Sequence, residues 1–184
     1  MAGNHITDFI TKFGGGTRQN RFLVSGSIGG RGTTKFSDFT KNQIHVRAAS
    51  LPASTISVIP VNWRGRTVNY PGDRVYSPWQ ITVLDDKPKG KERLFEAFHA
   101  WSNEINDHGT NVSKSLDLKN HFSTDWSVSH LDTNGNTTNK RNFILKNCWP
   151  ITIGEISLDM GADNTLVSFA VGIAYSHFEY DAVT

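Results

Sequence analysis

The chain has 184 residues, 20% of them charged, and a formal net charge of +2. This weak charge balance excludes a strongly basic, general nucleic-acid binder, and the length suits a single domain over residues 1–184 with a sizeable core. The one cysteine, Cys148, excludes an internal disulfide framework and fits synthesis in a reducing cytoplasm. The N-terminus lacks the basic region followed by an apolar run that is typical of a secretion signal. No apolar run reaches the ~20 residues that cross a bilayer.

Charge is distributed unevenly along the chain. Residues 1–93 hold 14 Lys and Arg against 6 Asp and Glu, a net of +8, and residues 94–184 hold 5 against 11, a net of −6. The two halves could interleave in space and cancel. Alternatively, the subunit has a basic surface and an acidic surface, which would suit head-to-tail association.

The first 16 residues are interpreted as an N-terminal arm. Apolar residues recur at helical spacing from Ile6 to Phe13, and three glycines at 14–16 then end the predicted helix. The alternative is a terminus without fixed structure.

Two strands are predicted next, over Asn20–Ile28 and Asn42–Ala48. The glycine-rich loop between them, Gly29–Thr34, lacks the Gly-Lys-Ser/Thr ending of a phosphate-binding loop. With Arg31 and Lys35 it is therefore predicted to be a basic contact loop at a subunit interface, mobile until assembly.

The segment Ser50–Asp86 reads SLPASTISVIPVNWRGRTVNYPGDRVYSPWQITVLDD. β-Branched and aromatic residues predict a strand over Thr55–Trp63, followed by a tight, basic corner. A second strand with one buried face is predicted by alternation. Its expected buried residues are Val75, Trp79, Ile81 and Val83; the charged residues expected at a subunit or ring interface are Arg64, Arg66, Asp73 and Arg74.

One long helix is predicted after this segment. Asp85 and Asp86 place negative charge near its start, Pro88 suits its first turn, and Gly109 is a plausible stop. The apolar stripe that should pack on a sheet is Leu94, Phe95, Phe98, Trp101 and Ile105.

Two hairpins are predicted in the C-terminal part. Asp125–Leu131 and Arg141–Trp149 flank a turn containing Asn-Gly, and Ile151–Asp159 pairs with Thr165–Phe178. Each strand of the second hairpin has a face suited to lining a channel, because acidic and small groups do not hold phosphates. The residues expected there are Glu155, Ser157 and Asp159 on one strand, and Ser168 with Ala170, Gly172 and Ala174 on the other.

No arrangement of reactive groups points to an enzyme. The seven histidines form no metal-ligand spacing with each other or with Cys148, so no metal or cofactor is predicted. Glu155 and Asp159 would lie roughly 13 Å apart on a strand, beyond the reach of glycosidase carboxylate pairs.

Together these patterns predict a mainly β fold of two packed antiparallel sheets, sandwich- or barrel-like, with one long helix and extended loops. The order LPA, IPV, GR-x-VN, GDR-x-Y, W-x-ITV within residues 51–83, and Trp149-Pro150 followed by Ile153–Ile156, resembles the tail tube protein of contractile-tailed bacteriophages.

The resemblance implies six-membered rings whose sheets join a continuous barrel and stack head to tail into a hollow tube. Such a tube is part of the virion, passes genomic DNA without sequence-specific binding, and contacts the sheath, baseplate hub, tail terminator and tape measure protein. A related inner tube of a contractile bacteriocin or type VI secretion particle is the alternative within this class. A monomeric β-sandwich module binding sugars or peptides, and an enzyme of unrecognised type, are the alternatives outside it.

Overall fold

The structure is a computed structural model that describes residues 6, 16–29, 45–86, 93–113, 123–132 and 141–182. The predicted arm (apart from Ile6 and Gly16), the loop carrying Arg31 and Lys35, and the turn at 133–137 lie outside the described residues. The elements are β1 (Phe22–Ser25), β2 (Val46–Ala49), β3 (Ser54–Trp63), β4 (Arg66–Tyr76), β5 (Trp79–Leu84), α2 (Leu94–Ile105), β6 (Thr124–His130), β7 (Arg141–Ile153), β8 (Ser168–Ala174) and β9 (His177–Ala182).

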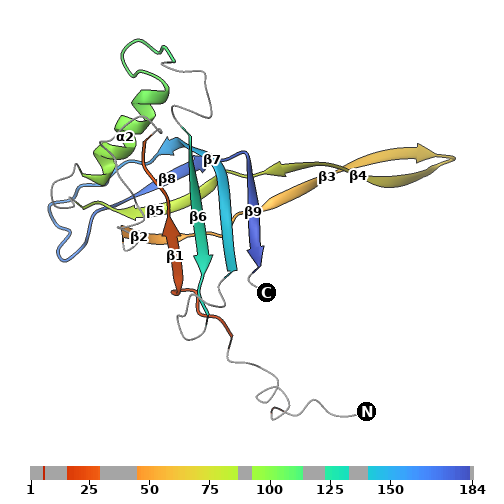
Figure 1. Cartoon of the computed structure of the whole chain (residues 1–184), viewed down its shortest axis with the longest axis horizontal. Coiled ribbons are helices and arrows are strands. Elements are labelled where there is room, and N and C mark those ends of the chain that lie inside the picture. The colour runs from red at the N-terminus through yellow and green to blue at the C-terminus, as the bar shows by residue number, and fades with distance from the viewer. Residues whose placement is uncertain are drawn as a thin grey trace.

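The body consists of antiparallel strands in the order β1-β6-β7-β8-β5-β2, with β9 also paired to β7. The long strand β7 belongs to two groups of strands: its first part pairs with β6 and β9, and its last part pairs with β8. We call β1-β6-β7-β9 sheet A and β7-β8-β5-β2 sheet B. Figure 1 shows the strands of the two sheets crossing at a steep angle, with α2 at one end. The described strands form a two-sheet sandwich, as predicted, and do not close into a barrel.

The core lies between the sheets and is built from aromatic rings. Trp126 of β6 contacts Trp79 of β5 at 6.1 Å between ring centroids, and stacks on Trp101 of α2 at 6.4 Å. Phe98 of α2 contacts both Trp126 and Phe169 of β8. Because one indole touches both sheets and the helix, these three layers pack as one cooperative unit.

The bend in β7 is fixed by polar groups on the outer face of sheet A. Asn147 has a φ of +55°, and its N–H donates to Asp125 Oδ1 at 3.2 Å. Lys146 Nζ lies 3.2 Å from Asp125 Oδ2 and 3.6 Å from Glu179 Oε2, so it links three neighbouring strands. The hydrogen bond to Asp125, with its negative charge and that of Glu179, raises the pKa of Lys146.

Helix α2 packs on the sheets as predicted, but it runs from Leu94 to Ile105, so it begins after the predicted first turn at Pro88 and ends before the predicted stop at Gly109. Its buried side chains are Leu94, Ala97, Phe98 and Trp101. Asp85 accepts a hydrogen bond from the Phe95 N–H at 3.3 Å, so a carboxylate ten residues upstream caps the helix. Asp86 also lies at the helix start, where its backbone carbonyl accepts a hydrogen bond from the Leu94 N–H at 3.2 Å, and its Oδ2 lies 2.8 Å from His45 Nε2, just before β2.

Three predicted strands have different limits in the structure. The strand predicted through Val75 and Trp79 is interrupted at Ser77-Pro78, because proline lacks the N–H that would continue the pairing. Val75, predicted to be buried with Trp79, Ile81 and Val83, is 58% exposed because it lies on the hairpin side of this break. The strand predicted over Thr165–Phe178 is divided into β8 and β9 around Tyr175. The strand predicted over Ile151–Asp159 ends at Ile153, because residues 154–167 are the irregular connection to β8. The expectation that Glu155, Ser157 and Asp159 share a strand face was therefore wrong.

Gly26 is needed for the packing of sheet A. A Cβ at this position would lie 2.3 Å from the Trp126 ring, which is fully buried and cannot move aside. We expect Gly26→Ala to lower the free energy of unfolding by about 1–3 kcal/mol, the usual cost of overpacking. Chemical denaturation would measure it. Gly161→Ala is the control, because the added Cβ would lie 3.6 Å from Asp159 Oδ1, an ordinary van der Waals distance; equal losses in both variants would contradict the packing argument.

Candidate assembly interface

The strands β3 and β4 form a two-stranded sheet of their own that extends away from the body (Figure 1). Their register runs from Ser54↔Tyr76 at the base to Trp63↔Arg66 at the tip. At about 3.4 Å per residue, a strand of ten residues extends roughly 34 Å. An isolated two-stranded hairpin is marginally stable at best in water, so this length indicates support from a partner.

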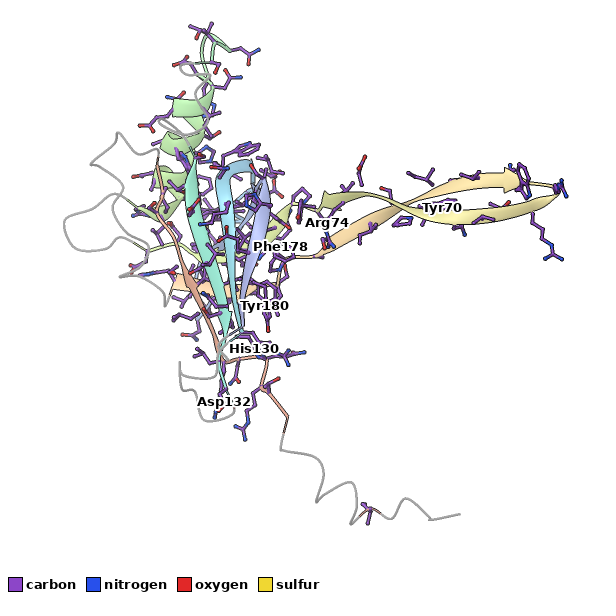
Figure 2. The ribbon with its side chains drawn as sticks, turned by 45° about the vertical axis from the view of Figure 1, so that its right-hand side comes forward. Tyr70, Arg74, His130, Asp132, Phe178 and Tyr180 are labelled. Carbon is purple, nitrogen blue, oxygen red and sulfur yellow. The ribbon has the colours of Figure 1, made fainter. Side chains whose placement is uncertain are left out.

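One face of the hairpin carries an apolar stripe. Directly paired residues share a face, so Ile59 and Tyr70 lie beside Val61 and Val68, and Trp63 follows at the tip. All five are more than a third exposed, including Trp63 at 66% and Tyr70 at 56%. Figure 2 shows Tyr70 on the projecting part of the hairpin. Large apolar side chains gathered on a projecting element make the hairpin a candidate surface for contact with another protein chain.

The tip joins this stripe to positive charge. Arg64 and Gly65 have φ values of +47° and +80° between the paired residues Trp63 and Arg66, as a type I′ turn requires. Arginine in this conformation is strained, whereas asparagine or glycine would fit without cost. The Arg64 guanidinium lies 5.5 Å from the centroid of the Trp63 ring. Retention of Arg64 at a strained position favours a function for its charge.

Asp73 and Arg74 lie at the base of the hairpin, not beside the arginines at the tip. The eight residues from Arg66 to Arg74 correspond to roughly 27 Å of strand. The predicted single corner was therefore wrong: Pro71-Gly72-Asp73 lies within β4, where the register shifts between Ile56 and Val58. Arg74 donates to Ser54 Oγ at 2.6 Å across the hairpin (Figure 2). Arg64, Arg66, Asp73 and Arg74 are all exposed.

A second surface, on the connection between β7 and β8, combines exposed apolar side chains with negative charge. The connection from β7 to β8, residues 154–167, carries Glu155, Asp159 and Asp163 and neither lysine nor arginine. A tight turn shapes it: Asp159 Oδ1 accepts from the Gly161 N–H at 2.9 Å, and the Ala162 N–H reaches the Asp159 carbonyl at 3.3 Å. We call this segment the acidic loop. Its large exposed apolar side chains are Leu158, Met160, Leu166 and Val167.

The outer face of sheet B is uncharged along three adjacent strand segments. Trp79–Leu84, Ser168–Ala174 and Trp149–Ile153 contain no Asp, Glu, Lys or Arg. The register pairs Thr82 with Ala170 across β5 and β8. Of the residues predicted to turn into the core, Phe169, Val171 and Ile173 are buried, whereas Val167 is exposed and the prediction for it was wrong. The residues on the outer face include Gln80, Thr82, Thr152, Ser168, Ala170 and Gly172.

The described residues contain no group of histidine, cysteine and acidic side chains that could hold a metal ion. Cys148 is fully buried, and desolvation raises the pKa of its thiol to about 12. At neutral pH the thiol is thus protonated and a poor nucleophile. Among the described helices none has the length and apolar character to span a bilayer.

Solved structures with this fold come from contractile injection machines. A chain of the anti-feeding prophage baseplate aligns with a TM-score of 0.64 and 13% identity, covering 91% of this chain and 97% of that one. A chain of the PVC extracellular contractile injection system, from its sheath-tube complex, aligns with a TM-score of 0.56 and 17% identity over 98% of this chain and all of that one.

The relatives found by sequence are tail tube proteins of phages. The tail tube protein gp19 of Enterobacteria phage T4 is 26% identical over 72% of this chain and 78% of its own length. The tail tube protein of Serratia phage KSP90 is 25% identical over 94% of this chain and 93% of its own. The family model described as phage tail tube protein matches residues 18–181. The chain belongs to the phage tail tube protein family.

Proposed function

We propose that this protein is the structural subunit of the inner tube of a contractile phage tail. Six copies form a ring, and rings stack head to tail into a hollow conduit for genomic DNA. The observation that carries the proposal is the β3–β4 hairpin, whose apolar residues lie on a projecting element and need another chain to cover them. Family membership supports a tube, and the similar anti-feeding prophage chain comes from a six-fold symmetrised baseplate.

The other proposed partners follow from where the structural relatives occur. Similar chains come from a sheath-tube complex, a sheath/tube terminator and a baseplate. We propose that this tube likewise contacts a sheath, a baseplate hub and a terminator, and that its lumen holds the tape measure protein and then DNA. The subunit is made in the host cytoplasm, resides in the virion, and has a structural rather than an enzymatic role. The relatives in extracellular injection systems favour one second candidate, the inner tube of a contractile particle without a genome.

Electron microscopy of the purified protein tests the central proposal. We expect rings or hollow rods, and uniform small monomers at every concentration would contradict it.

The charged interface residues are tested by Arg64→Glu with Arg66→Glu. Because both side chains are exposed, we expect a folded monomer that polymerises at least tenfold more weakly. Normal polymerisation of this double variant would remove both arginines from the interface.

We further propose that the outer face of sheet B lines the lumen. The predicted lumen residue Ser168 lies on this face, and Glu155, Ser157 and Asp159 continue along the chain from its border, where the Gly154 N–H donates to the Ala170 carbonyl at 2.7 Å. Along β7, β8 and β5 this face has no lysine or arginine, so these three segments offer DNA phosphates no ionic contact and the DNA slides; the exposed Arg47 belongs to β2, at the edge of the sheet.

The lumen proposal predicts that added positive charge slows DNA passage. Ser168→Lys in all six subunits would place a ring of ammonium groups around the DNA. We expect tubes of normal length and a several-fold slower release of DNA from assembled phage, with the slowing reduced at high salt. Ser168→Gln adds similar bulk without charge and is the control. Equal release rates for the lysine and glutamine variants would place Ser168 outside the lumen.

A further inference from the structure

The hairpin tip and the acidic loop lie at opposite ends of the subunit. Figure 1 is drawn with the longest axis horizontal: the hairpin reaches one end, and the loop between β7 and β8 lies at the other. This loop therefore cannot cover the hairpin of its own subunit. The loop can reach a hairpin tip only from a second copy.

The two ends complement each other in chemistry. Residues 54–76 of the hairpin carry three arginines and one aspartate, and residues 154–167 carry three carboxylates and no basic group. Each end also exposes large apolar groups: Trp63 at the tip, and Leu158 at 83% exposure with Met160 fully exposed on the loop. Apolar contact supplies affinity, and the opposite charges select the partner and its orientation.

We propose that the hairpin tip of one subunit docks on the acidic loop of a neighbouring copy, with Arg64 and Arg66 facing Asp159 and Asp163. Trp63 then packs against Leu158 and Met160. The contact joins two different surfaces, so it is heterologous: repeated from copy to copy, it builds a closed ring or a continuing stack. This inference rests on the proposed tube function and names the surface on the second copy that receives the hairpin.

The loop is prepared for this contact before assembly. Asp159 Oδ1 is held by the Gly161 N–H, and the Asp163 N–H reaches the Gly161 carbonyl at 3.1 Å. Asn164, with a φ of +57°, closes the turn. A preformed turn presents Met160 and both carboxylates with little ordering on binding, which favours association.

Charge reversal with rescue is the first test. We expect Asp159→Lys with Asp163→Lys to raise the concentration needed for polymerisation at least tenfold, as Arg64→Glu with Arg66→Glu does. Combining all four substitutions in one chain should bring it back to within about threefold of the original. Glu96→Lys with Glu104→Lys on α2 is the matched control, and it should neither weaken polymerisation nor rescue the arginine variant. Failure of the combined variant to recover, with its circular dichroism unchanged, would overturn the contact.

Cross-linking is the second test and leaves all proposed contact residues in place. In a Cys148→Ala background, Thr67→Cys beside the tip and Ala162→Cys in the loop are joined by a short flexible bismaleimide. We expect a ladder of covalent multimers from assembled tubes, and none when Val112→Cys beyond α2 replaces Ala162→Cys. Normal tubes that yield only monomers would overturn this contact while leaving the tube function standing. Absence of tubes from the unsubstituted chain would overturn the proposed function and this inference together.

Discussion

Shortening the β3–β4 hairpin will abolish tube formation without unfolding the subunit. The change replaces residues 60–69 by Asn-Gly, which closes a two-residue turn on the retained pair Ile59↔Tyr70. Whole cross-strand pairs are removed, so the register of the base is kept. The lost segment includes the tip and most of the exposed apolar stripe, whereas the core between the sheets is untouched.

We expect no polymer at concentrations 100-fold above those sufficient for the original chain, and a free energy of unfolding within about 1 kcal/mol of the parent. Sedimentation and electron microscopy measure assembly, and denaturation of the dissociated subunit measures stability. Arg64→Asn is the matched control, because asparagine accepts the positive φ of the turn and keeps the hairpin at full length. Its polymerisation should fall by no more than about tenfold. Tubes of ordinary appearance from the shortened chain would refute an assembly role for the hairpin.

Trp126→Ala will have the largest effect on stability of any single substitution considered. The Trp126 indole projects from β6, is fully buried, contacts rings of β5 and α2, and donates from Nε1 to Thr124 Oγ1 at 3.1 Å. Removing it leaves a cavity between three elements that cannot all close in. Aromatic-to-alanine changes in such cores cost about 3–5 kcal/mol, a large part of the stability of an ordinary domain.

Trp63→Ala deletes the same atoms from the tip of the hairpin and is the control. Because Trp63 is 66% exposed, we expect its loss to change subunit stability by about 0.5 kcal/mol or less and to weaken assembly strongly. Thermal or denaturant unfolding of the two dissociated variants makes the comparison. Similar unfolding transitions for both would contradict the assignment of one tryptophan to the core and the other to an interface.

The local elements with strong periodicity could be predicted from the sequence. The stripe through Phe98 and Trp101 predicted a helix that packs on the sheets, and the alternation through Ile81 and Val83 predicted a strand with one buried face; both are confirmed. Such patterns can be recognised in a sequence because a period of 3.6 residues in a helix, or 2 in a strand, places apolar groups on one side independently of the rest of the fold. The mainly β class and the family followed from these patterns and from two short motif blocks.

Where several strands end, and which of them are exposed, depends on the tertiary structure and could not be predicted from the sequence. Residues 154–159 alternate like a strand, yet the registered pairing with β8 ends at Ile153 and is extended only by the hydrogen bond from the Gly154 N–H to the Ala170 carbonyl, so the segment continues as a loop. The exposure of the β3–β4 hairpin could not be predicted from the sequence either, because the β-branched residues at 55–63 are equally typical of a strand in the core. The separation of Arg66 from Asp73 arose in the same way, since a bulge within β4 resembles a turn in sequence.

By itself, the sequence determined which residues alternate, where Gly65 permits a tight turn, and which half of the chain is basic. Only the tertiary structure decided that the basic hairpin tip and the acidic loop stand at opposite ends of the subunit. The physical reason is that periodicity and charge are properties of neighbouring residues, whereas the direction in which an element projects depends on how all the strands pair. In this protein that direction exposes an apolar hairpin, and in the proposed contact it sets the basic tip of one subunit against the acidic loop of another.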